Sequence, residues 1–164
     1  MEDDHGVCML RILILLAALP WSLVSQASWH AHLRHFDDPM ALRHALRDEA
    51  LAYVGAPYVA GGEGRYGFDC SGLVQHVFAT FRIQLPRSSG EQWRVGQKVA
   101  RNELEPGDLL FFATGRSKRI NHVAIYIGRG RFVHAATSSH GVRVASLAER
   151  YFQRRLMGAR RMLD

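Results

Sequence analysis

The spacing of apolar residues changes partway along this chain, and this change constrains its fold more than any other feature of the sequence. Apolar residues recur at helical spacing from Asp38 to Gly55 and again from Cys70 to Pro86. From Leu104 onward, short apolar runs separated by glycines replace this spacing, a pattern typical of strands joined by tight turns. Helices followed by a mostly antiparallel sheet predict an α+β domain.

The sheet should contain about five short strands. Between the two predicted helices, Pro57 to Gly67 is rich in glycine and predicts a loop. Ser88 to Trp93 predicts a helical turn, and Glu105 to Asp108 carries turn residues before the first strand. The predicted strands are Leu109 to Phe112, Val123 to Ile127, Phe132 to Ala135, Val142 to Ala145 and Leu156 to Met162.

Residues 1–27 have the layout of a secretory signal peptide. Arg11 precedes the apolar run Ile12 to Leu19, and small residues lead to a cleavage site after Ala27. The run is too short to anchor a mature protein across a bilayer. The acidic start at residues 2–4 is untypical of such a leader, so we expect translation to begin at Met9.

The rest of the chain has room for one ordinary domain. We expect residues 28–38 to form a flexible segment and residues 39–164 to form the domain. His30, His32 and His35 lie close together in the flexible segment, but a flexible tail is far more common there than a metal site. We therefore predict no metal and no cofactor, and we expect a monomer.

The chain is basic, with 21 Lys and Arg against 15 Asp and Glu. Removal of residues 1–27 takes away one basic and three acidic residues, which raises the net charge from +6 to +8. Charges of both signs are scattered, without the long basic block typical of nucleic-acid binding. The basicity fits either an acidic partner such as a wall or membrane surface, or a surface that only keeps the protein soluble. Cys8 precedes the apolar run, whereas a lipid-modified cysteine follows it, so we expect an exported protein without a stable membrane anchor.

Cleavage after Ala27 leaves Cys70 as the single cysteine. A lone thiol in an exported protein is either a reactive group or a buried inert side chain. Cys70 lies at the predicted start of a helix, where unpaired N–H groups and the helix dipole stabilise a thiolate. Its neighbours Leu73 and Val74 belong to the apolar stripe, so the sulfur should face the sheet. Cys70 is therefore a candidate nucleophile, which needs a base and a group that orients the base.

His122 and His134 are the candidates for these two roles. If Gly128 to Gly130 is a three-residue loop, Ala124 pairs with His134 and the two imidazoles share one face as diagonal neighbours. A two-residue loop would place them on opposite faces, and the glycine pattern favours the longer loop. We expect both rings on the side of the sheet that Cys70 meets, as in a papain-like Cys-His-polar triad.

Six short motifs between Ala41 and Arg161 carry a family resemblance. They are Tyr58-Val59-Ala60-Gly61-Gly62, Phe68-Asp69-Cys70-Ser71-Gly72-Leu73-Val74, Leu85-Pro86-Arg87-Ser88-Ser89, Pro106-Gly107-Asp108-Leu109, His122-Val123-Ala124-Ile125-Tyr126-Ile127-Gly128 and Phe132-Val133-His134-Ala135. In this order they resemble the NlpC-type family of cell-wall cysteine peptidases. The resemblance implies a papain-like α+β fold and hydrolysis of peptide bonds in the stem peptides of peptidoglycan.

The resemblance also implies roles for single residues. Cys70 matches the family's nucleophile, His122 the general base and His134 the polar residue that orients the base. Tyr58 matches a tyrosine that helps to shape the site.

Three further positions match places where the family contacts its substrate. Asp69 and Ser71 flank the nucleophile, and a carboxylate at position 69 can pair with a substrate amine. Arg87 is a candidate ligand for substrate carboxylates, or else a solvated loop arginine.

The expected activity is thus a peptidoglycan endopeptidase that works through an acyl-enzyme on Cys70. The resemblance is to small Gram-negative members, which places the protein in the periplasm. Two alternatives stay open: a catalytically silent peptidoglycan-binding protein and an acyltransferase on the same fold. The bond that is cut also stays open.

Overall fold

A computed structural model describes residues 38–136 and 140–163. The predicted signal peptide and residues 28–37 lie outside the described residues. The first described helix, α2 (Pro39–Ala52), begins where the sequence predicts, because the Asp38 carboxylate accepts a hydrogen bond from the Met40 N–H at 2.9 Å. Among the described residues no helix combines the length and the apolar character needed to cross a membrane.

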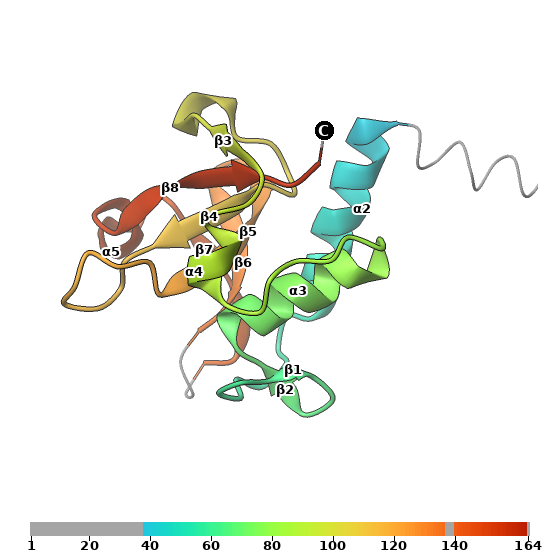
Figure 1. Cartoon of the computed structure of the whole chain (residues 1–164), viewed down its shortest axis with the longest axis horizontal. Helices are drawn as coiled ribbons and strands as arrows, with labels where there is room; N and C mark the ends of the chain where they lie inside the picture. The colour runs from blue at the N-terminus through green and yellow to red at the C-terminus, as the bar shows by residue number, and fades with distance from the viewer. Residues whose placement is uncertain (1–37, 137–139, 164) are drawn as a thin grey trace, which may run out of the picture. The chain divides into compact units, whose positions relative to one another are not determined.

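A six-stranded antiparallel sheet forms the centre of the domain (Figure 1). Its strand order is β3-β8-β4-β5-β6-β7. The strands are β3 (Gln97–Val99), β4 (Leu109–Phe112), β5 (His122–Gly128), β6 (Arg131–Ala135), β7 (Val142–Ser146) and β8 (Leu156–Arg161). The α+β class is confirmed, and the sheet has one strand more than the five expected.

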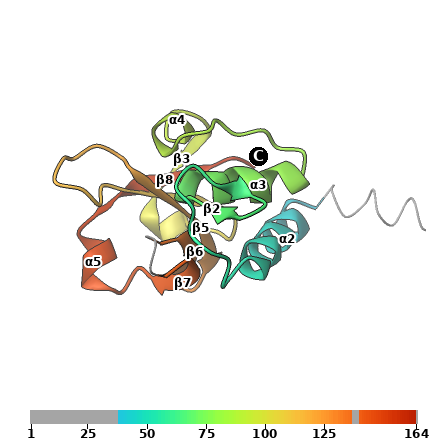
Figure 2. The ribbon, with the colours of Figure 1, turned by 90° about the horizontal axis from the view of Figure 1, so that it is seen from below.

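Successive residues of a strand point to opposite faces of the sheet. Both faces are buried because helices pack on each side. Leu109 and Phe111 of β4 pack toward α2 and α3 (Cys70–Thr80), whereas Leu110 and Phe112 pack toward α5 (Arg150–Gln153). Figures 1 and 2 show α2 and α3 on one side of the sheet and α5 on the other. The continuous apolar run of β4 fits this burial on both faces.

Helix α3 begins at Cys70, as the sequence predicts. The Asp69 carboxylate caps it by accepting the Gly72 N–H at 2.7 Å. A Cβ atom on Gly72 would overlap the carbonyl oxygen of Gly62, which itself accepts the Asp69 N–H at 3.0 Å. The first turn of α3 therefore packs directly against the glycine-rich loop, and only glycine fits at position 72.

Several short elements differ from the sequence prediction. The glycine-rich loop contains a small hairpin of β1 (Glu63–Gly64) and β2 (Gly67–Phe68). The predicted helical turn after Ser88 is α4 (Ser89–Gln92), with Ser88 and Glu91 in a reciprocal capping box. Helix α5 and the 3-10 turn Arg101–Glu103 were not predicted.

The turn between β5 and β6 corrects the predicted loop length. The strands leave only Arg129 and Gly130 between them, both with positive φ, instead of a three-residue loop. An irregularity between Tyr126 and Gly128 shifts the register by one residue, so Ile125 still pairs with Val133 as the longer loop would require. The predicted pairing of Ile125 with Val133 is thus correct, although a two-residue turn and a bulge produce it instead of a three-residue loop.

Candidate active site

Cys70 is the first residue of α3 and is partly buried against the core. Burial raises the pKa of its thiol, and the Asp69 charge acts in the same direction. Backbone N–H groups of Val123, Ser71 and Cys70 hydrogen-bond to the sulfur and oppose this rise without cancelling it. The N–H groups at the helix start thus lower the thiol pKa as expected, but burial outweighs them and the net pKa is raised.

His122 and His134 lie on neighbouring strands and contact each other directly. His122 Nε2 lies 2.9 Å from His134 Nδ1, and the two ring planes are nearly perpendicular, at 86°. Burial lowers the pKa of His122 to about 4. Burial, the His122 ring and the charge of Arg143 together lower the pKa of His134 to about 3. Both imidazoles are neutral at pH 7, which a general base requires.

The two rings share one face of the sheet, as predicted, but it is the face away from α3. Both pack with the aromatic cluster on the α5 side, where His122 contacts Phe112 and His134 contacts Phe152. The prediction that the rings lie on the side occupied by α3 is wrong. Cys70 nevertheless lines the same pocket as both rings. Its sulfur accepts a hydrogen bond from the backbone of Val123, the residue after His122 in β5.

A pocket of about 380 Å³ brings these groups together. Cys70, His122, His134 and Tyr58 all contribute to its wall. Burial raises the pKa of the Tyr58 hydroxyl, and Cys70 and Asp69 add to the rise, so this hydroxyl stays protonated and can donate a hydrogen bond.

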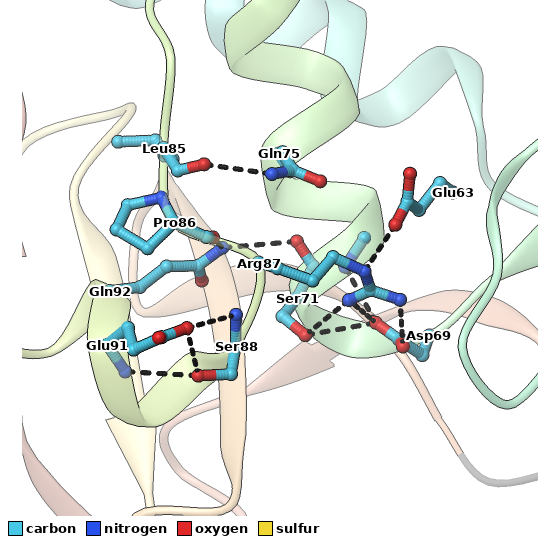
Figure 3. Close-up of polar contacts among 11 residues, drawn as sticks. Glu63, Asp69, Ser71, Gln75, Leu85, Pro86, Arg87, Ser88, Glu91 and Gln92 are labelled. Atoms are coloured by element: carbon cyan, nitrogen blue, oxygen red, sulfur yellow. Dashed lines mark hydrogen bonds and ion pairs between the residues drawn. The ribbon is translucent and has the colours of Figure 1, made fainter.

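Asp69, Ser71 and Arg87 form a separate cluster beside the nucleophile and do not line this pocket. Arg87 Nη2 lies 2.6 Å from Asp69 Oδ2, and Arg87 Nη1 lies 3.1 Å from both Asp69 Oδ1 and the Ser71 hydroxyl. Figure 3 shows the guanidinium between Asp69 and Glu63, to which Arg87 Nε also donates a hydrogen bond. Asp69 and Arg87 therefore neutralise each other before any substrate arrives.

Hydrogen bonds set the charge state of Asp69. Burial acts to raise the pKa of its carboxyl, but Arg87, the Gly72 N–H and the Ser71 hydroxyl outweigh burial, and the net pKa is lowered. The same carboxylate caps α3, so the ion pair also fixes the helix turn that carries Cys70.

The buried side chain of Gln92 hydrogen-bonds to the loop that carries Arg87. Gln92 Nε2 donates to the Pro86 carbonyl at 2.8 Å and to the Ser71 carbonyl at 3.2 Å (Figure 3). Gln75 of α3 donates to the Leu85 carbonyl at 2.8 Å. The loop is thereby tied to α3 on both sides of Pro86.

Sequence reasoning missed several residues around these sites. Glu63 lies in the glycine-rich loop, where no pattern marked it. Asn121 lines the pocket and accepts hydrogen bonds from the Thr114 N–H and hydroxyl through its Oδ1 atom. Arg143 and Glu149 line the pocket from β7 and from the start of α5. The alternation of β7 could have indicated which way Arg143 points, but not that β7 pairs with the strand of His134.

Within residues 38–136 and 140–163, no group of three or more His, Cys, Asp or Glu converges to hold a metal ion. The pocket wall combines a thiol, two neutral imidazoles and the Tyr58 hydroxyl with the charged side chains of Arg143 and Glu149.

Comparison with known proteins places this arrangement in a family. The model of the NlpC/P60 family matches residues 55–161. The chain is 44% identical over 126 residues to a gamma-DL-glutamyl hydrolase of Bacillus subtilis, covering 76% of this chain and 30% of that protein. It is 43% identical over 124 residues to the murein DD-endopeptidase MepS/murein LD-carboxypeptidase of Escherichia coli, covering 75% and 64%. The chain thus spans less than two thirds of either relative.

A solved structure supports the fold. The crystal structure of an NlpC/P60 family protein from Bacillus cereus superimposes with a TM-score of 0.70 at 35% identity, covering 74% of this chain and 40% of that one.

Proposed function

The chain belongs to the NlpC/P60 family, and from this premise we propose that it is a cysteine endopeptidase that hydrolyses peptide bonds in peptidoglycan. The name of the E. coli relative, a murein endopeptidase, supports the substrate class. One observation carries the proposal: Cys70 and the hydrogen-bonded pair His122–His134 line a single pocket.

The contact between the imidazoles assigns a role to each ring nitrogen. Because His122 Nε2 faces His134, His122 Nδ1 is the nitrogen left to accept the thiol proton. His122 must then carry its proton on Nε2 and donate it to His134 Nδ1, which leaves the His134 proton on Nε2. His134 Nε2 is buried without a hydrogen-bond partner among the described residues. The unsatisfied Nε2 costs stability, while the acceptor on His134 orients the base in the proposed mechanism.

The proposed reaction starts from the neutral Cys70 thiol and the neutral His122 imidazole. Cys70 Sγ attacks the carbonyl carbon of the scissile amide while its proton moves to His122 Nδ1. Backbone N–H groups at the start of α3 stabilise the oxyanion. Collapse breaks the C–N bond, and His122 returns the proton to the leaving amine. Water, deprotonated by His122, attacks the thioester and releases the acid and the free thiol.

The remaining predicted residues complete the site. Tyr58 donates its hydroxyl within the pocket, and the Asp69–Ser71–Arg87 cluster contacts the stem peptide beside it. We propose that the signal peptide predicted over residues 1–27 delivers the protein to the periplasm, where it acts on the wall as a monomer.

Replacement of the nucleophile tests the proposal. Cys70→Ala should abolish the release of peptides from purified peptidoglycan while its circular dichroism spectrum and thermal unfolding match those of the unmodified protein. His44→Ala, on the exposed side of α2, serves as the control and should retain full activity. Full digestion by Cys70→Ala would refute the mechanism, and an inactive but folded unmodified protein would indicate a binding protein instead. Mass spectrometry of the fragments identifies the bond that is cut and separates hydrolysis from acyl transfer.

A further inference from the structure

Arg143 lies on β7, the strand next to the one that carries His134. It is paired in register with His134 between β6 and β7, so the two side chains project from the same face. Arg143 is exposed and lines the same pocket as Cys70 and His122. A permanent positive charge therefore stands at the pocket wall, one strand away from the imidazole that orients the base.

Within the described residues this charge has no structural partner. In contrast, Arg43, Arg87 and Arg161 form ion pairs with carboxylates. Arg143 makes no hydrogen bond and no ion pair in the part of the chain that the structure describes. The single carboxylate in the described pocket wall, Glu149, is instead bound to the Ser146 N–H at 2.9 Å.

The charge of Arg143 also acts on the imidazole pair. It contributes, after burial and the His122 ring, to the lowered pKa of His134, so it opposes positive charge on the pair that His134 forms with His122. A bound anion removes this opposition because it neutralises the guanidinium. The geometry thus favours a substrate that brings its own negative charge to this wall.

We propose that Arg143 binds a free carboxylate that the substrate carries next to the scissile amide. The inference rests on the proposed function and adds a specificity determinant to it. A guanidinium holds a carboxylate through two parallel hydrogen bonds, whereas it cannot form the same charge-assisted pair with a carboxamide. The enzyme should therefore select amide bonds flanked by an ionised carboxyl group over those in which this group is amidated.

The test uses defined muropeptides in matched pairs, with the carboxyl next to the cleaved bond either free or converted to a carboxamide. We expect the unmodified enzyme to prefer the free acid, and Arg143→Gln to lower kcat/KM for the free acid about ten- to a hundredfold, as for loss of a hydrogen bond to a charged group. Cleavage of the carboxamide should change by less than about twofold. Arg143→Lys should restore part of the preference because it restores the charge.

Arg131→Gln is the matched control, since Arg131 is an exposed strand arginine of the same sheet outside this pocket. It should leave both rates unchanged. Equal loss on both substrates in Arg143→Gln, or no loss on either, overturns the inference while the proposed function stands. If the unmodified enzyme cleaves neither substrate nor intact peptidoglycan, the proposed function fails and the inference fails with it.

Discussion

His122 Nε2 and His134 Nδ1 lie 2.9 Å apart across two neighbouring strands. In the proposed mechanism this contact leaves Nδ1 of His122 for the Cys70 proton and requires the proton of neutral His122 on Nε2. The pair is surrounded by the rings of Phe112, Phe132 and Phe152, so its orientation is held by packing as well as by the hydrogen bond.

Replacement of His134 should therefore reduce turnover more than substrate binding. His134→Ala removes the acceptor for His122 Nε2–H, and we expect kcat to fall about a hundredfold or more because the base loses its tautomer and orientation. His134→Asn keeps a polar group at this position and should retain more activity than His134→Ala. Steady-state kinetics on one muropeptide, with kcat and KM measured separately, provide the check. A rise in KM with unchanged kcat would assign His134 to substrate binding instead.

The depressed pKa of His122 predicts an unusual pH profile. A general base works in its neutral form, so activity should be retained above its pKa and lost as the pH falls through about 4, well below the ordinary histidine value of 6.5. The profile of kcat/KM reports the free enzyme, which is the state described here. An acidic limb centred at pH 6.5 or higher would contradict the assignment.

Folding must be monitored in the same titration. Because both folded-state pKa values are lowered, the unfolded chain binds protons first as the pH falls below 6.5. The folded state therefore loses stability as the pH falls from 6.5 to about 3, the lower of the two folded-state pKa values. Circular dichroism at each pH separates unfolding from protonation of the base.

Gly72→Ala adds only one methyl group but should strongly destabilise the domain. The new Cβ meets the backbone carbonyl of Gly62, which cannot rotate away, and we expect a loss of about 2 kcal/mol or more in the free energy of unfolding. Gly90→Ala in α4 is the matched control, because its Cβ would meet nothing within 4 Å. Gly90→Ala should change stability by no more than about 1 kcal/mol. Urea unfolding of both variants measures the difference, and equal stabilities would show that the loop yields to the added methyl.

Much of the fold was predictable because its main elements carry strong local patterns. The predicted strand over Leu109 to Phe112 matches β4, since four consecutive apolar residues are buried there. β3 was missed because Gln97 and Lys98 are exposed and the strand is defined by its pairing with β8. Such pairing is a tertiary property that leaves no alternation in a three-residue segment.

The same distinction between local patterns and tertiary contacts applies to the candidate site. The approach of the two histidines followed from strand register, which alternation and turn chemistry specify. The face on which they lie did not follow, because alternation gives relative and not absolute direction. The ion pair of Arg87 with Asp69 joins the N-cap of α3 to the loop that follows this helix, 18 residues further along the chain, and no sequence pattern encodes that approach.

Val123 links the hydrophobic interior to the chemistry. Its side chain is completely buried in the cluster that includes α3, its N–H donates to the Cys70 sulfur, and the residue before it is the proposed base. Any substitution that shifts Val123 therefore moves the donor and the imidazole together relative to the thiol. Enlarging or trimming side chains deep inside this domain should thus tune the rate of the proposed reaction, even though no reacting atom is altered.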